Sequence, residues 1–416
     1  MNTPSKRLAV LVVVSALAWR CGAVEPVRAA APGIAPIDLP AAIRLALAQP
    51  GVRAAGHEVA AAEAASAQAG RPPNPELQVL REGQEAGKRT TTVQLNQPLE
   101  LGGKRQARVA LARGALQLAD GELRTRRLDV RADVIAGFHE AVVAERKKEL
   151  AEALAALARR SAEVTAKRVA AGKVSPIDET RARLAALDAA AELQQAAAAL
   201  AVAKARLSAL TGQPADALVL AQAPYELPAP EPLAALRARA GEAGSIRRAR
   251  GQLAVQEAQA QVERAARIPD LTVSVGTQRD EQAGRRQTVL GLSLPLPLFN
   301  RNEDALRAAL SRSDRARDEL AAAETATAAA LAAAHARYEA ARNEAALLRQ
   351  DVVPQALSAY ELTLKGFEHG KFSFLDVLDA QRTWFQAQSR RWNSTLEAWR
   401  ALAEIERIAG PAESNE

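Results

Sequence analysis

The sequence has few of the residues that large compact cores, disulfides and soft metal sites require. Of its 416 residues, only 3% are aromatic, one is cysteine and one is methionine. A single cysteine excludes an intramolecular disulfide and a site built from several thiolates. Alanine is abundant instead, and it loses no side-chain entropy when a helix forms. We therefore expect long helices that pack closely side by side.

The sequence also lacks the patterns of several function classes. No segment after the first 29 residues has 18 or more apolar residues without a charge, so we expect no transmembrane helix. The motifs G-x-x-x-x-G-K-[ST] and G-x-G-x-x-G after a strand are absent, and no nucleophile–base pair is indicated, so we expect no enzyme and no cofactor. The net charge of +7 is spread over basic residues that alternate with acidic ones, which is typical of solvated helix faces and not of a nucleic-acid site.

The N-terminal segment has the pattern of a signal peptide. Two basic residues precede a short apolar run at 8–19, and a cleavage site at Val27-Arg28-Ala29 would remove residues 1–29. Cys21 would leave with this segment. Lipidation of Cys21 stays open as an alternative, although the Trp-Arg pair before it differs from the small residues of a lipoprotein signal.

Three segments occur twice in the same order, about 195 residues apart, which indicates an internal duplication. The pairs are Pro75-Glu76-Leu77-Gln78-Val79 with Pro269-Asp270-Leu271-Thr272-Val273, Val93 to Leu101 with Leu290 to Leu298, and Gly172-Lys173-Val174-Ser175-Pro176-Ile177-Asp178 with Gly370-Lys371-Phe372-Ser373-Phe374-Leu375-Asp376.

The duplication predicts two repeats of one pattern, joined by a proline-rich linker. Each repeat contains a helix, a β-hairpin and a long helical hairpin, because strand alternation is followed by long proline-poor, alanine-rich stretches. The predicted boundaries are 30–214 for the first repeat (helix 38–70, β-hairpin 75–101, helical hairpin 104–210), 215–231 for the linker, 232–410 for the second repeat (helix 232–266, β-hairpin 269–298, helical hairpin 302–409 interrupted at Pro354) and 411–416 for a disordered tail.

The strand at 287–298 suggests a membrane sheet. Its leucines, from Leu290 to Leu298, share one face, and small or polar residues and prolines share the other. Such a strand fits lipid on one side and a watery lumen on the other, although a small amphipathic sheet packed on a helix stays open. The two prolines require an edge or a bend. Since four strands cannot close a membrane barrel, two copies with eight strands or three with twelve would have to combine.

The chain resembles the TolC-type family of outer-membrane efflux channels, most closely its heavy-metal, CzcC-like branch. The resemblance rests on Leu99-Glu100-Leu101-Gly102-Gly103-Lys104-Arg105, on Leu292 to Asn302, and on Gly370 to Ala380. It implies a mainly α fold with a membrane β-barrel contribution, in which a homotrimer forms a twelve-stranded barrel in outer-membrane lipid and a helical tunnel into the periplasm. It also implies a periplasmic adaptor and an inner-membrane RND pump as partners.

The resemblance further implies a gate and an adaptor contact at the two helix reversals, 168–178 and 366–379. An acidic ring at the narrow end would fall on Asp376 and Asp379. Phe372 and Phe367 stand where the drug-exporting relatives have an Arg and a Tyr that form a polar lock, so this gate must close differently. The adaptor would touch the reversals themselves, at Gly172, Lys173, Ser175, Asp178, Gly370, Lys371 and Ser373.

Several of these residues also have a purely structural interpretation. Asp178 and Asp376 each follow a serine by three residues at a helix start and fit capping residues, whereas Asp379 lies past the cap. The histidines, at 57, 139, 335 and 369, show no metal-ligand spacing, and we keep only His369 as a transient-contact candidate. Phe385, Trp392 and Trp399 share a helix face and predict interhelix packing.

The sequence therefore predicts a passive outer-membrane channel for heavy-metal efflux. Within the same fold, an outlet for drug efflux or type I protein secretion is the main alternative. A periplasmic coiled-coil adaptor is an alternative of another class, but it would carry one helical hairpin instead of two.

Overall fold

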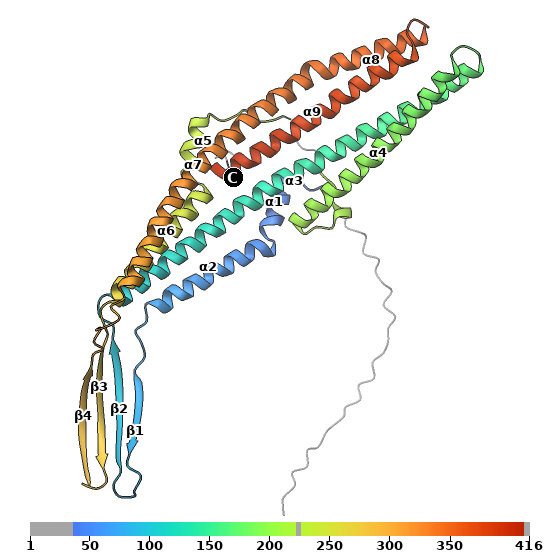
Figure 1. Ribbon diagram of the computed structural model, residues 1–416. Coiled ribbons are helices and arrows are strands. Elements are labelled where there is room, and N and C mark those ends of the chain that lie inside the picture. Colours follow the sequence, from blue (N-terminus) through green and yellow to red (C-terminus); the bar gives the residue numbers. More distant parts are fainter. Residues whose placement is uncertain (1–35, 222–225, 412–416) are drawn as a thin grey trace, which may run out of the picture. The chain divides into compact units, whose positions relative to one another are not determined.

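The structure is a computed structural model that describes residues 36–221 and 226–411 (Figure 1). The predicted signal peptide with Cys21, residues 222–225 of the predicted linker and residues 412–416 of the predicted tail lie outside the described residues.

Both halves of the chain contain short helices, a β-hairpin and a long helical hairpin, in the same order. The elements of the first half are α1 (Leu39–Leu47), α2 (Pro50–Ala69), β1 (Glu76–Glu82), β2 (Thr90–Leu99), α3 (Lys104–Ala170), α4 (Pro176–Thr211) and the 3₁₀ turn η1 (Ala215–Ala217). Those of the second half are α5 (Leu233–Ala240), α6 (Gly244–Ala266), β3 (Leu271–Asp280), β4 (Arg285–Ser293), α7 (Glu303–Leu347), the π-helical segment η2 (Leu348–Val352), α8 (Val353–Glu368) and α9 (Phe374–Ala409).

Helix α3 contains 67 residues and packs against α2, α4, α6 and α9. At 1.5 Å per residue it is about 100 Å long. Small residues allow the close packing that its composition predicts. A Cβ atom added at Gly114 would lie 3.5 Å from Val255 of α6, and one at Gly251 would lie 3.1 Å from Leu118. The helices therefore approach each other with little side-chain bulk between them.

Apolar clusters hold the helices together, and the three largest among the described residues join different elements. One joins α1, α3 and α4 around Phe138 and Leu207, and a second joins α5, α7 and α9 around Leu331 and Tyr338. A third lies toward the helix reversals and brings α4 and α3 residues against Tyr360, Phe367, Phe374 and Trp384 of α8 and α9. This third cluster connects the two helical hairpins directly.

The helix expected at 232–266 is wrong as a single element, because α5 and α6 are separated by residues 241–243. Glycine occurs on both sides of this break. A Cβ atom at Gly244 would lie 2.5 Å from the hydroxyl oxygen of Thr125, so the start of α6 approaches α3 more closely than another residue would allow. Glycine also weakens a helix interior by about 1 kcal/mol relative to alanine.

The strand expected to reach Leu298 ends earlier, at Ser293. Pro295 and Pro297 have no N–H to donate, so the chain cannot continue the ladder through them. The interruption expected at Pro354 lies just N-terminal to it, in the π-helical segment η2, and the proline itself falls in the first turn of α8.

Candidate functional site

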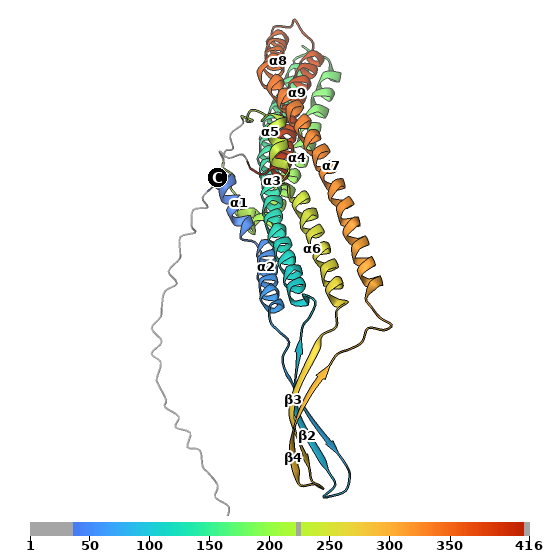
Figure 2. The same ribbon diagram turned by 90° about the vertical axis from the view of Figure 1, so that its left-hand side faces the viewer.

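The four strands form one antiparallel sheet in the order β1-β2-β3-β4, and the two hairpins lie side by side (Figure 1; Figure 2 shows the sheet turned by 90°). The register places apolar residues of all four strands in continuous rows on one face. The central row consists of Leu77, Leu95, Val275 and Leu290, and its neighbours contain Val79 with Val93 on one side and Val273 with Leu292 on the other. This face is exposed in the single chain, where 78% of Leu290 and 75% of Leu292 are accessible.

The opposite face of the sheet is polar. Gln78 Oε1 accepts hydrogen bonds from the amides of Gln94 at 2.7 Å and Asn96 at 3.1 Å. The amides of Gln278 and Gln287, on the second hairpin, are also joined by a hydrogen bond. The sheet thus separates an apolar surface from a carboxamide-rich one, which is the division expected of strands between lipid and water.

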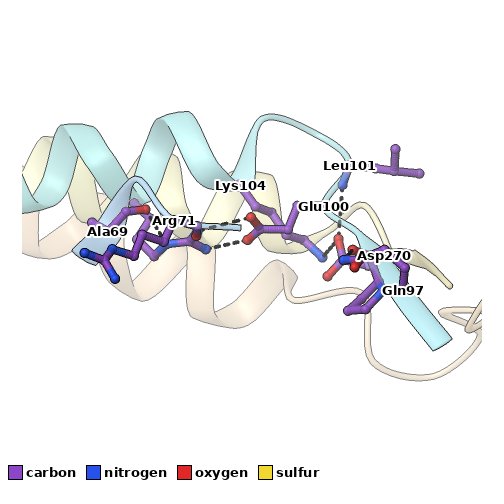
Figure 3. A network of polar contacts seen from close by, with 9 residues as sticks. Ala69, Arg71, Gln97, Glu100, Leu101, Lys104 and Asp270 are labelled. Carbon is purple, nitrogen blue, oxygen red and sulfur yellow. Dashed lines mark hydrogen bonds and ion pairs between the residues drawn. The ribbon is translucent and has the colours of Figure 1, made fainter. Parts of the chain in front are cut away.

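A polar network fixes the corner where the strands meet the helices (Figure 3). The guanidinium group of Arg108 pairs with the Glu100 carboxylate and donates to the carbonyl oxygen of Ala69 at 2.9 Å. Asp270 Oδ1 accepts from Lys104 Nζ at 2.8 Å and from the backbone N–H of Leu101 at 3.1 Å. Since Asp270 immediately precedes β3, the network joins the two hairpins at their helix end.

This corner explains the segment Leu99 to Arg105 that carries the family resemblance. Gly102 and Gly103 have φ angles of 68° and 75°, in the left-handed region that favours glycine. A Cβ atom at Gly102 would also lie 2.7 Å from Cβ of Ile268. Two of the three charged residues of the segment, Glu100 and Lys104, take part in the polar network.

The two helix reversals have similar backbones but different caps. Gly172 and Gly370 adopt φ angles of 69° and 72°. In the second reversal, the Ser373 hydroxyl and the Asp376 carboxylate form a capping box, and these hydrogen bonds hold the pKa of Asp376 below its ordinary value. In the first reversal, Ser175 accepts a long 3.4 Å bond from the N–H of Ile177, two residues on.

Asp178 does not take part in a capping box. Its carboxylate faces Arg181 at 3.7 Å, so the structural role predicted for both aspartates fits only Asp376. Asp376 and Asp379 are both exposed on the first turns of α9, and Lys173 and Lys371 are exposed beside the glycines of the reversals.

The two predicted gate phenylalanines have different environments. Phe367 is 9% exposed and packs against Phe374, with ring centroids 5.7 Å apart. Phe372 is 50% exposed and lies over Gly366, where a Cβ atom would come within 2.1 Å of the Phe372 ring. Phe367 therefore belongs to the cluster between the hairpins, and Phe372 projects partly into solvent.

One contact between the reversals was not singled out from the sequence. The guanidinium carbon of Arg168, at the end of α3, lies 4.6 Å from the ring centroid of Phe367 on α8. This cation–π contact joins the two helical hairpins at their reversals. The sequence offers a charged residue at 168 but no signal that pairs it with a ring almost 200 residues away.

The histidines have no shared site. His139 is 3% exposed and stacks on Trp399, and His335 bonds the carbonyl oxygen of Glu231 at 2.9 Å. In the second reversal, His369 is exposed, and its ring contacts the Lys365 carbonyl. Within residues 36–221 and 226–411, no three potential metal ligands lie together, and no helix is both long and apolar enough to cross a membrane.

The fold, the two-faced sheet and the paired reversals define an outer-membrane channel of the efflux class, and the sequence comparison agrees. The chain belongs to the outer membrane efflux protein family, whose pattern it matches over residues 42–213 and 238–411. It is thus an outer-membrane protein that extends into the periplasm.

Individual relatives define a branch within this family. The cobalt-zinc-cadmium resistance protein CzcC of Cupriavidus metallidurans is 39% identical over 380 residues, which cover 90% of each chain. The nickel and cobalt resistance protein CnrC of the same organism is 30% identical over 74% of this chain and 70% of its own. The solved outer membrane protein VceC of Vibrio cholerae has the same fold, with a TM-score of 0.76 at 22% identity, covering 90% of this chain and 96% of that one.

Proposed function

We propose that this chain is the outer-membrane channel of a tripartite RND-type efflux system, and that it passively conducts heavy-metal cations from the periplasm to the exterior. The cations are cobalt, zinc and cadmium, nickel, or copper and silver. The resistance functions named for CzcC and CnrC support this substrate class, and the similarity to CzcC extends over 90% of the chain. Conduction requires no catalytic residue and no cofactor, and the proposal assigns none.

The edges of the sheet support assembly from several copies. Strands β1 and β4 each have one neighbour, so their outer edges carry unpaired N–H and C=O groups in a single chain. In lipid each such group would cost several kcal/mol. Pairing β1 of one copy with β4 of the next removes both edges, and three copies give twelve strands with the apolar rows facing lipid. The proposed assembly is therefore a homotrimer.

The exposed carboxylates at the second reversal support a gate. In a trimer, Asp376 and Asp379 would each form a ring of three around the axis, and such rings concentrate negative potential and favour cations. Phe372 and Phe367 would supply the apolar part of this gate. The glycines, lysines and serines of both reversals, together with Asp178, would contact a periplasmic adaptor, which joins the channel to the inner-membrane pump. These residues are Gly172, Lys173, Ser175, Asp178, Gly370, Lys371 and Ser373.

Resistance measurements test the substrate class. The gene is deleted and restored in a host with its own adaptor and pump, and growth is measured across a panel of divalent metals, silver and common drugs. Restoration of resistance to one or more of the metals and to none of the drugs is the expected result. Restoration against drugs alone would assign the channel to drug efflux.

Single-channel conductance tests the gate. Changing Asp376 and Asp379 to Asn should weaken the preference for cations over anions, because each substitution removes three charges from the axis. Asp178→Asn is the matched control, since Asp178 starts the equivalent helix of the first repeat and faces Arg181. Unchanged ion selectivity in both aspartate variants would remove these residues from the gate.

A further inference from the structure

A row of arginines crosses the apolar face of the sheet near the hairpin turns. Arg81 pairs in register with Thr91, Thr91 pairs with Arg279, and Arg279 pairs with Arg286. Directly paired residues of antiparallel strands share a face, with Cβ atoms about 5 Å apart. The three guanidinium groups therefore extend from the same face as the leucine and valine rows, at the end of the sheet farthest from the helices.

No acidic side chain in the part of the chain that the structure describes neutralises this row. None of the three arginines forms an ion pair or side-chain hydrogen bond with any residue in 36–221 or 226–411. The adjacent acids, Glu82 and Asp280, lie on the opposite face because neighbouring residues of a strand alternate. The Asp280 carboxylate is also used within the turn, where it accepts from the N–H groups of Gln282 and Ala283.

Like charges placed directly opposite each other on a sheet destabilise it. Arg279 and Arg286 are such a pair, so the row costs free energy unless an anion lies against it. The opposite boundary of the apolar face, at the helix end of the sheet, differs in its charge balance. There Arg108 is paired with Glu100, and Lys104 with Asp270, so the charges balance within the chain.

The position of the row also fits a membrane boundary. On β3, the apolar face extends from Leu271 to Thr277 and ends at Arg279. The distance from Leu271 to Arg279 is about 27 Å at 3.4 Å per residue. The outward apolar band of a membrane barrel is about 25 Å tall. The guanidinium groups would therefore lie at the level of the lipid headgroups.

We propose that Arg81, Arg279 and Arg286 form a binding site for the phosphate groups of anionic lipids in the leaflet at the hairpin turns. Guanidinium groups bind phosphate oxygens in a bidentate manner, and three of them in one row match a headgroup that carries more than one phosphate. This inference rests on the proposed placement of the sheet in the membrane. In the proposed channel, that leaflet is the outer one, and each pair of hairpins contributes one such site.

The test uses the full-length channel in nanodiscs of phosphatidylcholine with and without lipid A, and native mass spectrometry counts the retained lipid A molecules. Arg81→Gln, Arg279→Gln and Arg286→Gln are combined. A basic residue near an anionic surface contributes about fivefold in affinity, so the triple variant should lose roughly 100-fold. Arg285→Gln is the matched control, because Arg285 adjoins Arg286 on the opposite face and should change nothing.

Thermal unfolding provides a second readout, because the stability difference between the triple variant and the wild type should change sign when lipid A is added. In pure phosphatidylcholine the triple variant should be as stable as the wild type or more stable, because repulsion between arginines is removed. With lipid A the wild type should be the more stable protein. Free inorganic phosphate at the same phosphate concentration should not displace lipid A. Full displacement would contradict the lipid site and would assign the arginines to a soluble anion instead.

Two results overturn the inference in distinguishable ways. A wild type that enters nanodiscs and conducts ions, yet retains lipid A no better than the triple variant does, removes the arginine site and leaves the channel intact. A wild type that stays out of nanodiscs removes the proposed membrane sheet, and the lipid site with it.

Discussion

The imidazole ring of His139 on α3 lies flat on the indole ring of Trp399 on α9, with ring centroids 3.8 Å apart and planes 5° apart. His139 is 3% exposed, and its Nε2 atom has no hydrogen-bond partner among the described residues. Burial lowers the pKa of His139 to about 3. The histidine is therefore neutral in the folded protein over most of the acidic range, and it acts as an aromatic packing residue between the two halves of the chain.

This burial predicts a loss of stability in acid. The unfolded chain takes up a proton on this histidine near pH 6.5, whereas the folded chain does so only near pH 3, so the unfolded state binds more protons in between. Stability should be full above pH 6.5 and fall toward pH 3, by at most about 1.4 kcal/mol per pH unit. Melting temperatures in detergent at pH 7.5 and 5.0 measure this fall.

His139→Phe should keep the ring stack and reduce the difference between the two pH values. His57→Phe is the control, since His57 is exposed on α2 and should leave the difference as in the wild type. An identical pH dependence in wild type and His139→Phe would show that other groups cause it.

The contact between Arg168 and Phe367 predicts the behaviour of the proposed gate. Arg168→Ala removes a cation–π contact that contributes about 0.5–1 kcal/mol at an exposed site. If this contact holds the hairpins together, the variant should open two- to fivefold more often in single-channel recordings. Lys167→Ala removes a charge from the same turn, but the side chain of Lys167 has no ion pair or hydrogen bond with any described residue, so it should not change opening. Equal open probabilities in Arg168→Ala and wild type would dismiss the contact as a latch.

The tight corner between β2 and α3 predicts that a single methyl group added at Gly102 lowers the stability of the protein. Gly102→Ala and Gly284→Ala both place alanine at a positive φ angle, which costs about 1 kcal/mol. Only Gly102→Ala also collides with Ile268, because at Gly284 no atom of the described residues, apart from the two chain neighbours, lies within 4 Å of a Cβ. Chemical denaturation should therefore show a loss for Gly102→Ala that is larger by about 1–3 kcal/mol. Adding Ile268→Ala should reduce this excess loss of stability. If the excess persists, the collision with Ile268 is not its cause.

The two helix caps predict different effects of the same substitution. Ser373→Ala removes the bond that the Ser373 hydroxyl accepts from the N–H of Asp376 and the bond that it donates to the Asp376 carboxylate, and it should cost about 1 kcal/mol or more. Ser175→Ala removes one long bond and should cost less. Since hydrogen bonding lowers the pKa of Asp376, the cap's contribution should be present above the ordinary carboxyl range and be lost as pH falls through the lowered value. Hydrogen exchange at the start of α9, compared with α4, measures both effects.

The duplicated motifs predicted the strands and the long helices because strand alternation and proline-free alanine runs are local signals. The end of β4 and the break between α5 and α6 required more than periodicity. The first depends on where the ladder can no longer be formed near Pro295, and the second on the approach of Gly244 to Thr125, 119 positions earlier in the chain. The prolines are visible in the sequence but do not fix the last paired residue, whereas the contact between Gly244 and Thr125 joins distant residues and leaves no trace in a local pattern.

As with the fold, the local features of the candidate site could be predicted from the sequence, whereas those that depend on tertiary contacts could not. Gly172 and Gly370 were recognised as turn residues, and their φ angles agree with that prediction. The caps of Asp178 and Asp376 looked equivalent in sequence, but only one forms a capping box. The arginine row was not foreseen, because its three members come from three strands and meet only through the register of the sheet.

The two helical hairpins differ in how they can transmit motion. Helix α3 is continuous from Lys104 to Ala170, so a rotation of the first hairpin at its reversal would reach the corner where Glu100 pairs with Arg108 and Asp270 with Lys104. The second hairpin contains η2, and a π-helical turn is a place where a helix bends or changes its winding. We therefore expect the first helical hairpin to move as a rigid body and the second to bend at η2. Displacement of the second reversal can be absorbed at 348–352 without disturbing the strands.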